Sequence, residues 1–255
     1  MKERSAFNPT LQPPMEPTAA MVRQLATPSG RFLDLHLVRF DAATFNVQSF
    51  ATAGISLPLA VARSVVVRQA EYFYGRLAAS AALKSLGSAN GHIGVGKGRE
   101  PVWPEGFVGS ISHVLGLAAA VAGDRNNHVA LGLDLERTAQ GPALSALRAV
   151  ALSEPELETL RSVGGALSQQ ELVTLSFSAK ESLFKGAYPT VQTFFDFSAA
   201  QIQAIELDRG VVVLSIAADL HDNFRHGRRC EIGFSRLDAE TFVTVFDDAV
   251  FGEGR

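Results

Sequence analysis

The sequence predicts an α+β protein made of two similar halves. One strand, a long helix and further strands come first, and helices followed by strands then repeat this order, although no convincing sequence repeat joins the halves. The chain has 255 residues, of which 47% are apolar and 19% charged, enough for a sizeable core without wholesale disorder. We expect a flexible Pro-rich segment over 1–20, an N-terminal lobe over 21–127 and a C-terminal lobe over 128–255.

Periodicity and helix boundary signals define the elements of the N-terminal half. Leu33, Leu35 and Leu37 alternate with polar residues, which is typical of a half-buried strand. Pro58 and Gly87 bound a long helical pattern, with Pro in the first turn and Gly after the last. The strands predicted in this half are 31–40, 107–113 and 117–122.

Helix caps and turns organise the C-terminal half. Ser153 as N-cap, Pro155 in the first turn and Glu156 at the capping-box position predict a helix start. A later helix should stop before Pro189, and Asp208-Arg209 should close a hairpin. The predicted helices are 142–152, 154–163 and 169–188, and the predicted strands are 128–136, 193–197, 202–207, 210–216, 229–235 and 241–246.

Composition excludes several classes of protein. The net charge of −3 gives no global electrostatic case for binding nucleic acid or an anionic membrane. Cys230 is the only cysteine, so no intrachain disulfide or cysteine zinc site can form, which suits a reducing cytosol. No apolar run approaches the ~18 residues of a membrane span, and prolines stand where a secretion signal would have its apolar core. We therefore expect a cytoplasmic protein.

Three carboxylates are the first candidates for chemistry. Asp134 and Glu136 follow an apolar run at positions i and i+2, which point to the same face of a strand. Glu181 lies 45 residues on, in a predicted helix. Carboxylates from two elements suit a hard cation such as Mg²⁺, which also binds substrate phosphates. The alternative is an ordinary exposed strand end, with Glu181 and Lys185 as a simple i, i+4 helix pair.

Basic and polar residues suggest a phosphate partner for these acids. Residues 58–100 hold six basic residues against two acids. Ser112 and His113 end a predicted strand and could bind phosphate, or they could simply face solvent. Arg76 and Arg99 could grip a terminal phosphate or be solvated surface residues. Neither a Walker spacing nor a Gly-x-Ser-x-Gly elbow is present.

The combination of short motifs is more specific than any one of them. In chain order they are Gly75-Arg76, Gly98-Arg-Glu-Pro101 with Trp103-Pro104, Gly109-Ser-Ile-Ser-His113, Gly132-Leu-Asp-Leu-Glu136 and Phe177-Ser-Ala-Lys-Glu-Ser-Leu-Phe-Lys185. Together they strongly resemble the 4′-phosphopantetheinyl transferases, in particular the large, two-lobed type that serves siderophore and other nonribosomal peptide synthetases. The likeness runs from about Arg68 to Phe197.

The resemblance implies an activity, a cofactor and partners. Such an enzyme transfers 4′-phosphopantetheine from coenzyme A to a serine of an acyl or peptidyl carrier protein, with Mg²⁺, and releases adenosine 3′,5′-bisphosphate. It implies a pseudo-two-fold monomer with coenzyme A in the cleft between lobes, and carrier domains of nonribosomal peptide or polyketide synthases as partners. The alternatives are a Mg²⁺-dependent coenzyme A or nucleotide pyrophosphate hydrolase and a non-catalytic coenzyme A-binding protein.

The resemblance also implies roles for single residues at the phosphates. Asp134, Glu136 and Glu181 match the Mg²⁺-binding acids, and Lys185 matches a lysine near the pyrophosphate. Asp134, Glu181 and Lys185 would thus take part in catalysis. The residues matching contacts to coenzyme A are Ser112 and His113 at its phosphates and Arg76 and Arg99 at its 3′-phosphate and adenine end, with Arg68 as a peripheral contact.

The resemblance implies roles for two further residues. Lys180 matches the lysine of the Lys-Glu-Ser core, where it would be an orienting contact. Glu156 falls where some members place a glutamate thought to deprotonate the carrier serine, and here it could equally be a capping-box residue. The surface for the carrier protein is expected over 137–165, apolar with a basic rim.

Overall fold

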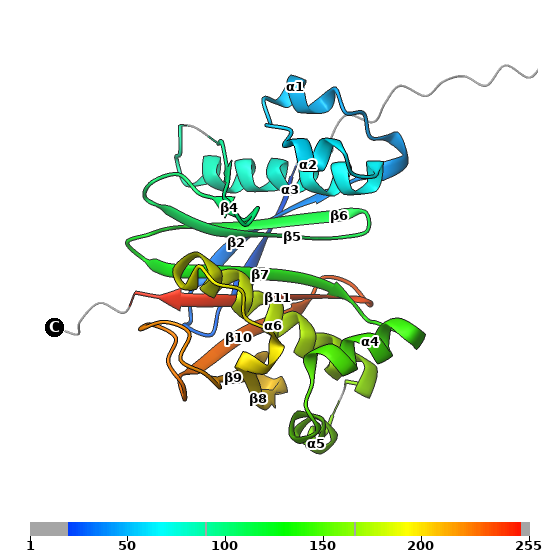
Figure 1. Cartoon of the computed structure of the whole chain (residues 1–255), viewed down its shortest axis with the longest axis vertical. Coiled ribbons are helices and arrows are strands. Elements are labelled where there is room, and N and C mark those ends of the chain that lie inside the picture. The colour runs from blue at the N-terminus through cyan, green and yellow to red at the C-terminus, as the bar shows by residue number, and fades with distance from the viewer. Residues whose placement is uncertain (1–19, 90, 166, 251–255) are drawn as a thin grey trace, which may run out of the picture.

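The computed structural model describes residues 20–89, 91–165 and 167–250, so residues 1–19 of the predicted flexible segment lie outside it. Its main strands form two antiparallel sheets, and each sheet carries one long helix, which confirms the α+β class (Figure 1). Strands of the first sheet come from before Asn127 and strands of the second from after it. The two lobe boundaries themselves stay a prediction.

The first sheet has four strands, in the order β1 (Met21–Ala26), β2 (Phe32–Arg39), β6 (Leu117–Asp124) and β5 (Phe107–Val114). Leu33, Leu35 and Leu37 are buried in β2, as their alternation predicts. The long helix α3 (Val66–Ser85) buries its alanine-rich face against this sheet. The smaller elements are η1 (Ala42–Thr44), α1 (Ser49–Ala53), α2 (Leu59–Ala62), β3 (Gly94–Val95) and β4 (Pro101–Val102).

The second sheet has five strands, in the order β7 (His128–Arg137), β11 (Thr241–Ala249), β10 (Arg229–Arg236), β9 (Val211–Ile216) and β8 (Ala200–Glu206). The hairpin between β8 and β9 turns at the predicted place, through η3 (Leu207–Arg209). Three helices lie between β7 and β8 in the chain, and a short turn, η2 (Phe197–Ala199), comes directly before β8. The helices are α4 (Gly141–Ala151), α5 (Glu154–Ser162) and α6 (Gln169–Val191).

The two sheets meet along β5 and β7, which are edge strands of their own sheets. Ser110 Oγ accepts a hydrogen bond from the Leu133 amide at 2.9 Å, and Ser112 Oγ accepts one from the Leu135 amide at 3.0 Å. Two side-chain hydroxyls thus satisfy amides on the outer edge of β7 that would otherwise be buried without partners. We call this contact the seam. In Figure 1 it lies between the neighbouring ribbons of β5 and β7.

Apolar side chains from both sheets form one core behind the seam. Leu35 and Val121 of the first sheet belong to the same buried cluster as Leu133, Leu135 and Val245 of the second. Alternate residues of β7 therefore face two ways. The leucines enter the shared core, and the residues between them face α6.

Helix α6 lies unusually close to β7. A Cβ atom at Gly132 would come within 1.8 Å of the Ser182 carbonyl oxygen and within 2.7 Å of the Gly186 amide nitrogen. Only glycine permits that approach, because any side chain would overlap the helix backbone. The close contact brings the polar face of α6 directly over the end of β7.

Two predicted helix boundaries are wrong. The helical pattern from Pro58 is broken into α2 and α3, with Arg63, Ser64 and Val65 in between. Helix α6 passes through Pro189 and ends at Val191, where Gln192 adopts a left-handed conformation with φ of 56°. A proline in the last helical turn removes only one internal hydrogen bond near an end that frays anyway, so the helix tolerates it.

The predicted strand over 193–197 is also wrong. This segment is irregular, and it ends in η2, where the Asp196 carboxylate accepts a hydrogen bond from the Ser198 amide at 2.9 Å. The aspartate provides a local partner for the backbone, which competes with pairing in a sheet. Strand β1 and helix α1 were not predicted. Among the described residues, no helix is long and apolar enough to cross a membrane.

Replacing Ser110 with Ala should weaken the seam. The Leu133 amide would lose its hydrogen-bond acceptor at a buried place, where Ser110 is 3% exposed. We expect the free energy of unfolding, measured with urea, to fall by about 1–3 kcal/mol. Ser145→Ala, on the exposed surface of α4, is the matched control and should change it by less than about 0.5 kcal/mol. Equal stability of both variants would contradict the role of the seam.

The N-terminus of α6 should make stability depend on pH. Arg236 donates to the Glu171 carboxylate, and the Ser168 amide donates to it at 2.7 Å, which together lower the pKa of Glu171 to about 2. A lowered carboxyl pKa stabilises the fold above pH 4.5, and this stabilisation is lost as the pH falls towards 2. The stability difference between the wild type and Glu171→Gln, from urea unfolding, should therefore shrink between pH 5 and pH 3. A constant difference would argue against the contact.

Candidate active site

A cavity of about 430 Å³ opens where α3, β5, β7 and α6 come together, so both sheets contribute to it. It is strongly charged. The ionisable residues along its wall are Arg68, Glu71, Arg76, Arg99, His113, Asp134, Glu136, Glu181 and Lys185. Eight of the nine residues predicted as metal ligands or coenzyme A contacts therefore share this wall, and the ninth, Lys180, does not.

Asp134 is the centre of the hydrogen-bond network. Its Oδ1 accepts from Lys185 Nζ at 2.6 Å and from Ser112 Oγ at 3.0 Å, and its Oδ2 accepts from Ser178 Oγ at 2.8 Å. Asp134 is only 5% exposed, and a carboxylate buried to that extent needs such partners. Because Ser112 also binds the Leu135 amide, the seam holds Asp134 in place.

Glu136 and Glu181 are the less well compensated acids. Burial and the nearby carboxylates of Asp134 and Glu181 raise the pKa of Glu136 to about 7, against the opposite effect of Lys185. Burial also raises the pKa of Glu181, and the Asp134 carboxylate adds to this. Burial and neighbouring negative charge both disfavour the charged carboxylate, and a bound cation would oppose both effects. Their chemistry therefore fits a hard divalent cation.

The three acids do not converge on a single point between them. Across residues 20–89, 91–165 and 167–250, no group of three His, Cys, Asp or Glu side chains stands close enough to hold a metal ion. The ammonium of Lys185 instead lies against Asp134. The three acids share one cavity, as the sequence predicts, and their service as metal ligands stays a prediction.

His113 of β5 connects the first sheet to the cavity. Its Nε2 lies 2.7 Å from Arg68, which can only donate, so Nε2 is the acceptor. Its Nδ1 lies 3.7 Å from the Glu71 carboxylate. Burial lowers the pKa of His113, although Glu71 acts in the opposite direction. Arg68, whose side chain is half exposed, thus contacts a predicted phosphate-binding residue, and its own contact with coenzyme A stays a prediction.

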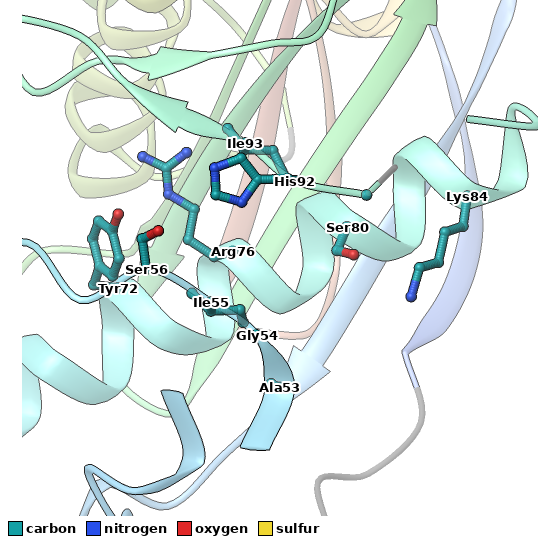
Figure 2. A pocket seen from close by; sticks show the side chains of 11 residues that line it. Ala53, Gly54, Ile55, Ser56, Tyr72, Arg76, Ser80, Lys84, His92 and Ile93 are labelled. Carbon is teal, nitrogen blue, oxygen red and sulfur yellow. The ribbon is translucent and has the colours of Figure 1, made fainter. Parts of the chain in front are cut away.

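Arg76 separates the main cavity from a second pocket of about 170 Å³. It is 6% exposed, donates to the Gly94 carbonyl at 3.0 Å and lies 5.0 Å from the centre of the Tyr72 ring. Figure 2 shows Tyr72, Arg76 and His92 together in this pocket, with Lys84 farther along α3. The pocket is therefore basic and has an aromatic wall.

Arg99 reaches the cavity from a tight turn. Its amide donates to the Gly96 carbonyl at 3.0 Å, and its φ of 71° is left-handed, which is uncommon for a residue with a side chain. Such strain persists where the surrounding structure enforces it, often at binding sites. The side chain lines both the main cavity and an adjoining pocket of about 460 Å³.

The structure places Glu156 and Lys180 away from the lining of the main cavity. They form a buried ion pair, with Lys180 Nζ 2.6 Å from Glu156 Oε1. The capping box at the start of α5 is confirmed, since Glu156 accepts a hydrogen bond from the Ser153 amide at 2.8 Å. The catalytic role predicted for Glu156 has no support in these contacts.

Both halves of the chain match models of one family. The 4′-phosphopantetheinyl transferase N-terminal domain matches residues 58–123, and the 4′-phosphopantetheinyl transferase superfamily model matches residues 130–237. The matched residues include the seam, the three acids and Lys185. The chain belongs to the 4′-phosphopantetheinyl transferase superfamily.

Curated relatives agree with this assignment. The chain is 32% identical over 171 residues to enterobactin synthase component D of Salmonella typhi. This alignment covers 67% of this chain and 69% of that protein. It is 35% identical over 150 residues to the 4′-phosphopantetheinyl transferase Svp of Streptomyces mobaraensis. That second match spans 59% of this chain and 60% of Svp, less than two thirds of its length. The predicted family is confirmed.

Sequence reasoning missed two residues that contact the predicted site residues. Ser178 binds Asp134, and Glu71 lies beside His113. A signal for Ser178 exists, because Ser178, Glu181 and Lys185 stand three and four residues apart and so share one face of α6. Glu71 has no such signal, since its approach to His113 depends on how α3 crosses β5.

Lys185→Met should expose the dependence of Asp134 on its counter-charge. The buried carboxylate would retain two hydroxyl donors and lose the ammonium that pairs with it. We expect the free energy of unfolding in EDTA to fall by about 2–3 kcal/mol, below the usual cost for a fully buried pair because Lys185 is partly exposed.

The exposed Lys97 provides the control, and Lys97→Met should change stability by less than about 0.5 kcal/mol. Adding Asp134→Asn to Lys185→Met should recover part of the loss, because no uncompensated charge then remains. Urea unfolding measures the free energy of unfolding of the wild type and of these three variants. A Lys185→Met variant as stable as Lys97→Met would refute the assignment.

Proposed function

We propose that this protein transfers 4′-phosphopantetheine from coenzyme A to a serine of a carrier protein. The main support is that the two family models meet at one charged cavity. Cations from the first half and carboxylates from the second face each other there, which is the arrangement that a polyphosphate with a divalent cation needs. Adenosine 3′,5′-bisphosphate is the second product.

In this proposal the residues bind coenzyme A from one end to the other. Arg76 and Arg99 would hold the 3′-phosphate and adenine end, next to the basic pocket of Figure 2. Ser112, His113 and Lys185 would contact the pyrophosphate. In support, Lys185 already donates to Ser112 Oγ at 3.1 Å, so the two donors lie together.

The three cavity acids complete the site. Asp134, Glu136 and Glu181 would hold Mg²⁺, which supplies charge neutralisation at the pyrophosphate oxygens. Lys185 would leave Asp134 and turn its ammonium towards phosphate, a short movement because one side chain can reach both groups. The raised pKa values of Glu136 and Glu181 support a need for positive charge at this place.

The transfer itself is a displacement at phosphorus. The serine oxygen bonds to the β-phosphorus, the bond from that phosphorus to the bridging oxygen breaks, and the bisphosphate leaves with the electron pair. The serine proton passes to water or to a carboxylate at the cavity. Positioning and electrostatics carry such a reaction, so no covalent enzyme intermediate is required.

The finer parts of the proposal concern partners and place. Acyl or peptidyl carrier domains of nonribosomal peptide or polyketide synthases are the proposed acceptors, with siderophore synthesis as one setting, since one relative is named enterobactin synthase component D. A monomer is proposed because one chain supplies both sheets around the cavity. A cytoplasmic location fits a single, buried cysteine.

Intact mass of an apo carrier domain tests this function. Incubation with the protein, coenzyme A and Mg²⁺ should add one phosphopantetheine, and EDTA should prevent the addition. Glu181→Ala should lower the rate at least about 100-fold, the scale expected for losing one electrostatic contact in a preorganised site. Glu105→Ala, in the exposed turn before β5 and outside the expected carrier surface, should react like the wild type.

Two other outcomes would contradict the proposal. Steady breakdown of coenzyme A without any gain on carriers from fatty-acid and peptide synthetases would indicate a hydrolase. Binding of coenzyme A without breakdown or transfer would indicate a non-catalytic binding protein.

A further inference from the structure

The most completely buried ion pair outside the cavity joins α5 to α6. Lys180 Nζ lies 2.6 Å from Glu156 Oε1, and the two side chains are 2% and 5% exposed. Removing two charges from water to this extent is costly unless every polar atom finds a partner. The contacts around the pair therefore show what it does.

Every donor of the ammonium is used. Besides Glu156, Lys180 donates to the Ala151 carbonyl at 2.7 Å and to the Phe197 carbonyl at 3.1 Å. A lysine ammonium has three donors, and three acceptors surround it. Ala151 is the last residue of α4, and Phe197 is the first of η2, so Lys180 ties two segments to α6.

The carboxylate is equally engaged. Glu156 Oε2 accepts from the Ser153 amide at 2.8 Å and from the Ser153 hydroxyl at 2.7 Å. Its Oε1 accepts from the Ile202 amide at 2.9 Å as well as from Lys180. Glu156 thus joins the start of α5 to the outer edge of β8, which is an edge strand.

These contacts are unlike those of a proton acceptor. A general base needs an oxygen within reach of the proton that it removes and a pKa near the working pH. Burial opposes the charged form of Glu156, but the hydrogen bonds from Lys180, Ser153 and Ile202 prevail and lower its pKa. A carboxylate with a lowered pKa and two engaged oxygens is a poor base.

The pair stands beside the site. Lys180 lies on the wall of an adjoining cavity of about 360 Å³, and Glu181, the next residue on α6, lines both that cavity and the main one. Val150 of α4 and Phe197 of η2 belong to the wall of that adjoining cavity. These two residues come from the same segments whose carbonyls Lys180 holds, so the pair sets the distance of that wall from Glu181.

We propose that Glu156 and Lys180 are positioning residues that act as one unit, which holds α4, the start of α5 and η2 beside Glu181, and that neither contacts coenzyme A nor accepts the serine proton. The effect on transfer rests on the proposed function, because α4 and α5 lie in the surface expected to receive the carrier protein. The structural part stands independently of it.

A double-mutant cycle with Glu156→Gln, Lys180→Met and the double variant tests the proposal. Each single variant leaves one charge buried without its partner, so its Tm should fall by roughly 10 °C. The double variant has no unpaired charge, and its Tm should lie above that of the less stable single variant. The cycle needs neither substrate nor activity, so it remains decisive if the proposed transfer itself fails.

Kinetics supplies the second readout. In Glu156→Gln, kcat/KM for the carrier should fall about 100-fold, as expected for a displaced wall, while the Kd for coenzyme A stays within about twofold and the pH profile of kcat keeps its shape. The double variant should regain part of this loss. Glu171→Gln is the matched control, because Glu171 is also a capping-box glutamate but belongs to α6 and pairs with Arg236.

The opposite pattern would overturn the proposal. It consists of a Glu156→Gln variant with the Tm of the wild type, a kcat that no longer depends on pH at its acidic limb, and no recovery in the double variant. That result would return Glu156 to the role of general base. A double variant less stable than both single variants would equally refute a single positioning unit.

Discussion

The seam between β5 and β7 is the contact on which the site depends. Two serine hydroxyls replace the backbone ladder that would otherwise join the edges of two sheets. Backbone hydrogen bonds between the strands would leave their amides and carbonyls no further partner. A serine hydroxyl, in contrast, can accept from an amide and still donate to another group. Ser112 does both, because it accepts from Leu135 and donates to Asp134. The joint between the halves and the centre of the acidic cluster are therefore the same group of atoms.

Close packing of α6 supplies the other half of the geometry. Gly132 lets the helix backbone approach β7, and this approach brings Ser178 and Lys185 within hydrogen-bond distance of Asp134. The opposite face of the same helix buries Lys180 against Glu156. One helix thus presents Glu181 and Lys185 to the cavity and is itself fixed from behind. Sites built on such packed elements keep their geometry better than sites on loops.

The parts of the fold that follow local rules could be predicted from the sequence, and the parts that depend on tertiary contacts could not. The alternation around Leu35 and the capping box at Ser153 were sufficient for β2 and α5. Pro189 was misleading, because its cost at a helix end is small, and the 193–197 segment was misleading because Asp196 caps a turn there. Glu156 could not be assigned from its motif, since only the fold shows that Lys180 and Ile202 occupy its oxygens.

Diffraction from crystals grown with coenzyme A and Mn²⁺ would test the central claim, that the seam builds a site for metal and pyrophosphate. The anomalous signal should show an ion within ligand distance of Asp134, Glu136 and Glu181, with the pyrophosphate beside it and Lys185 turned from Asp134 towards a phosphate oxygen. Coenzyme A bound elsewhere, or an ion that leaves Lys185 paired with Asp134, would contradict the account.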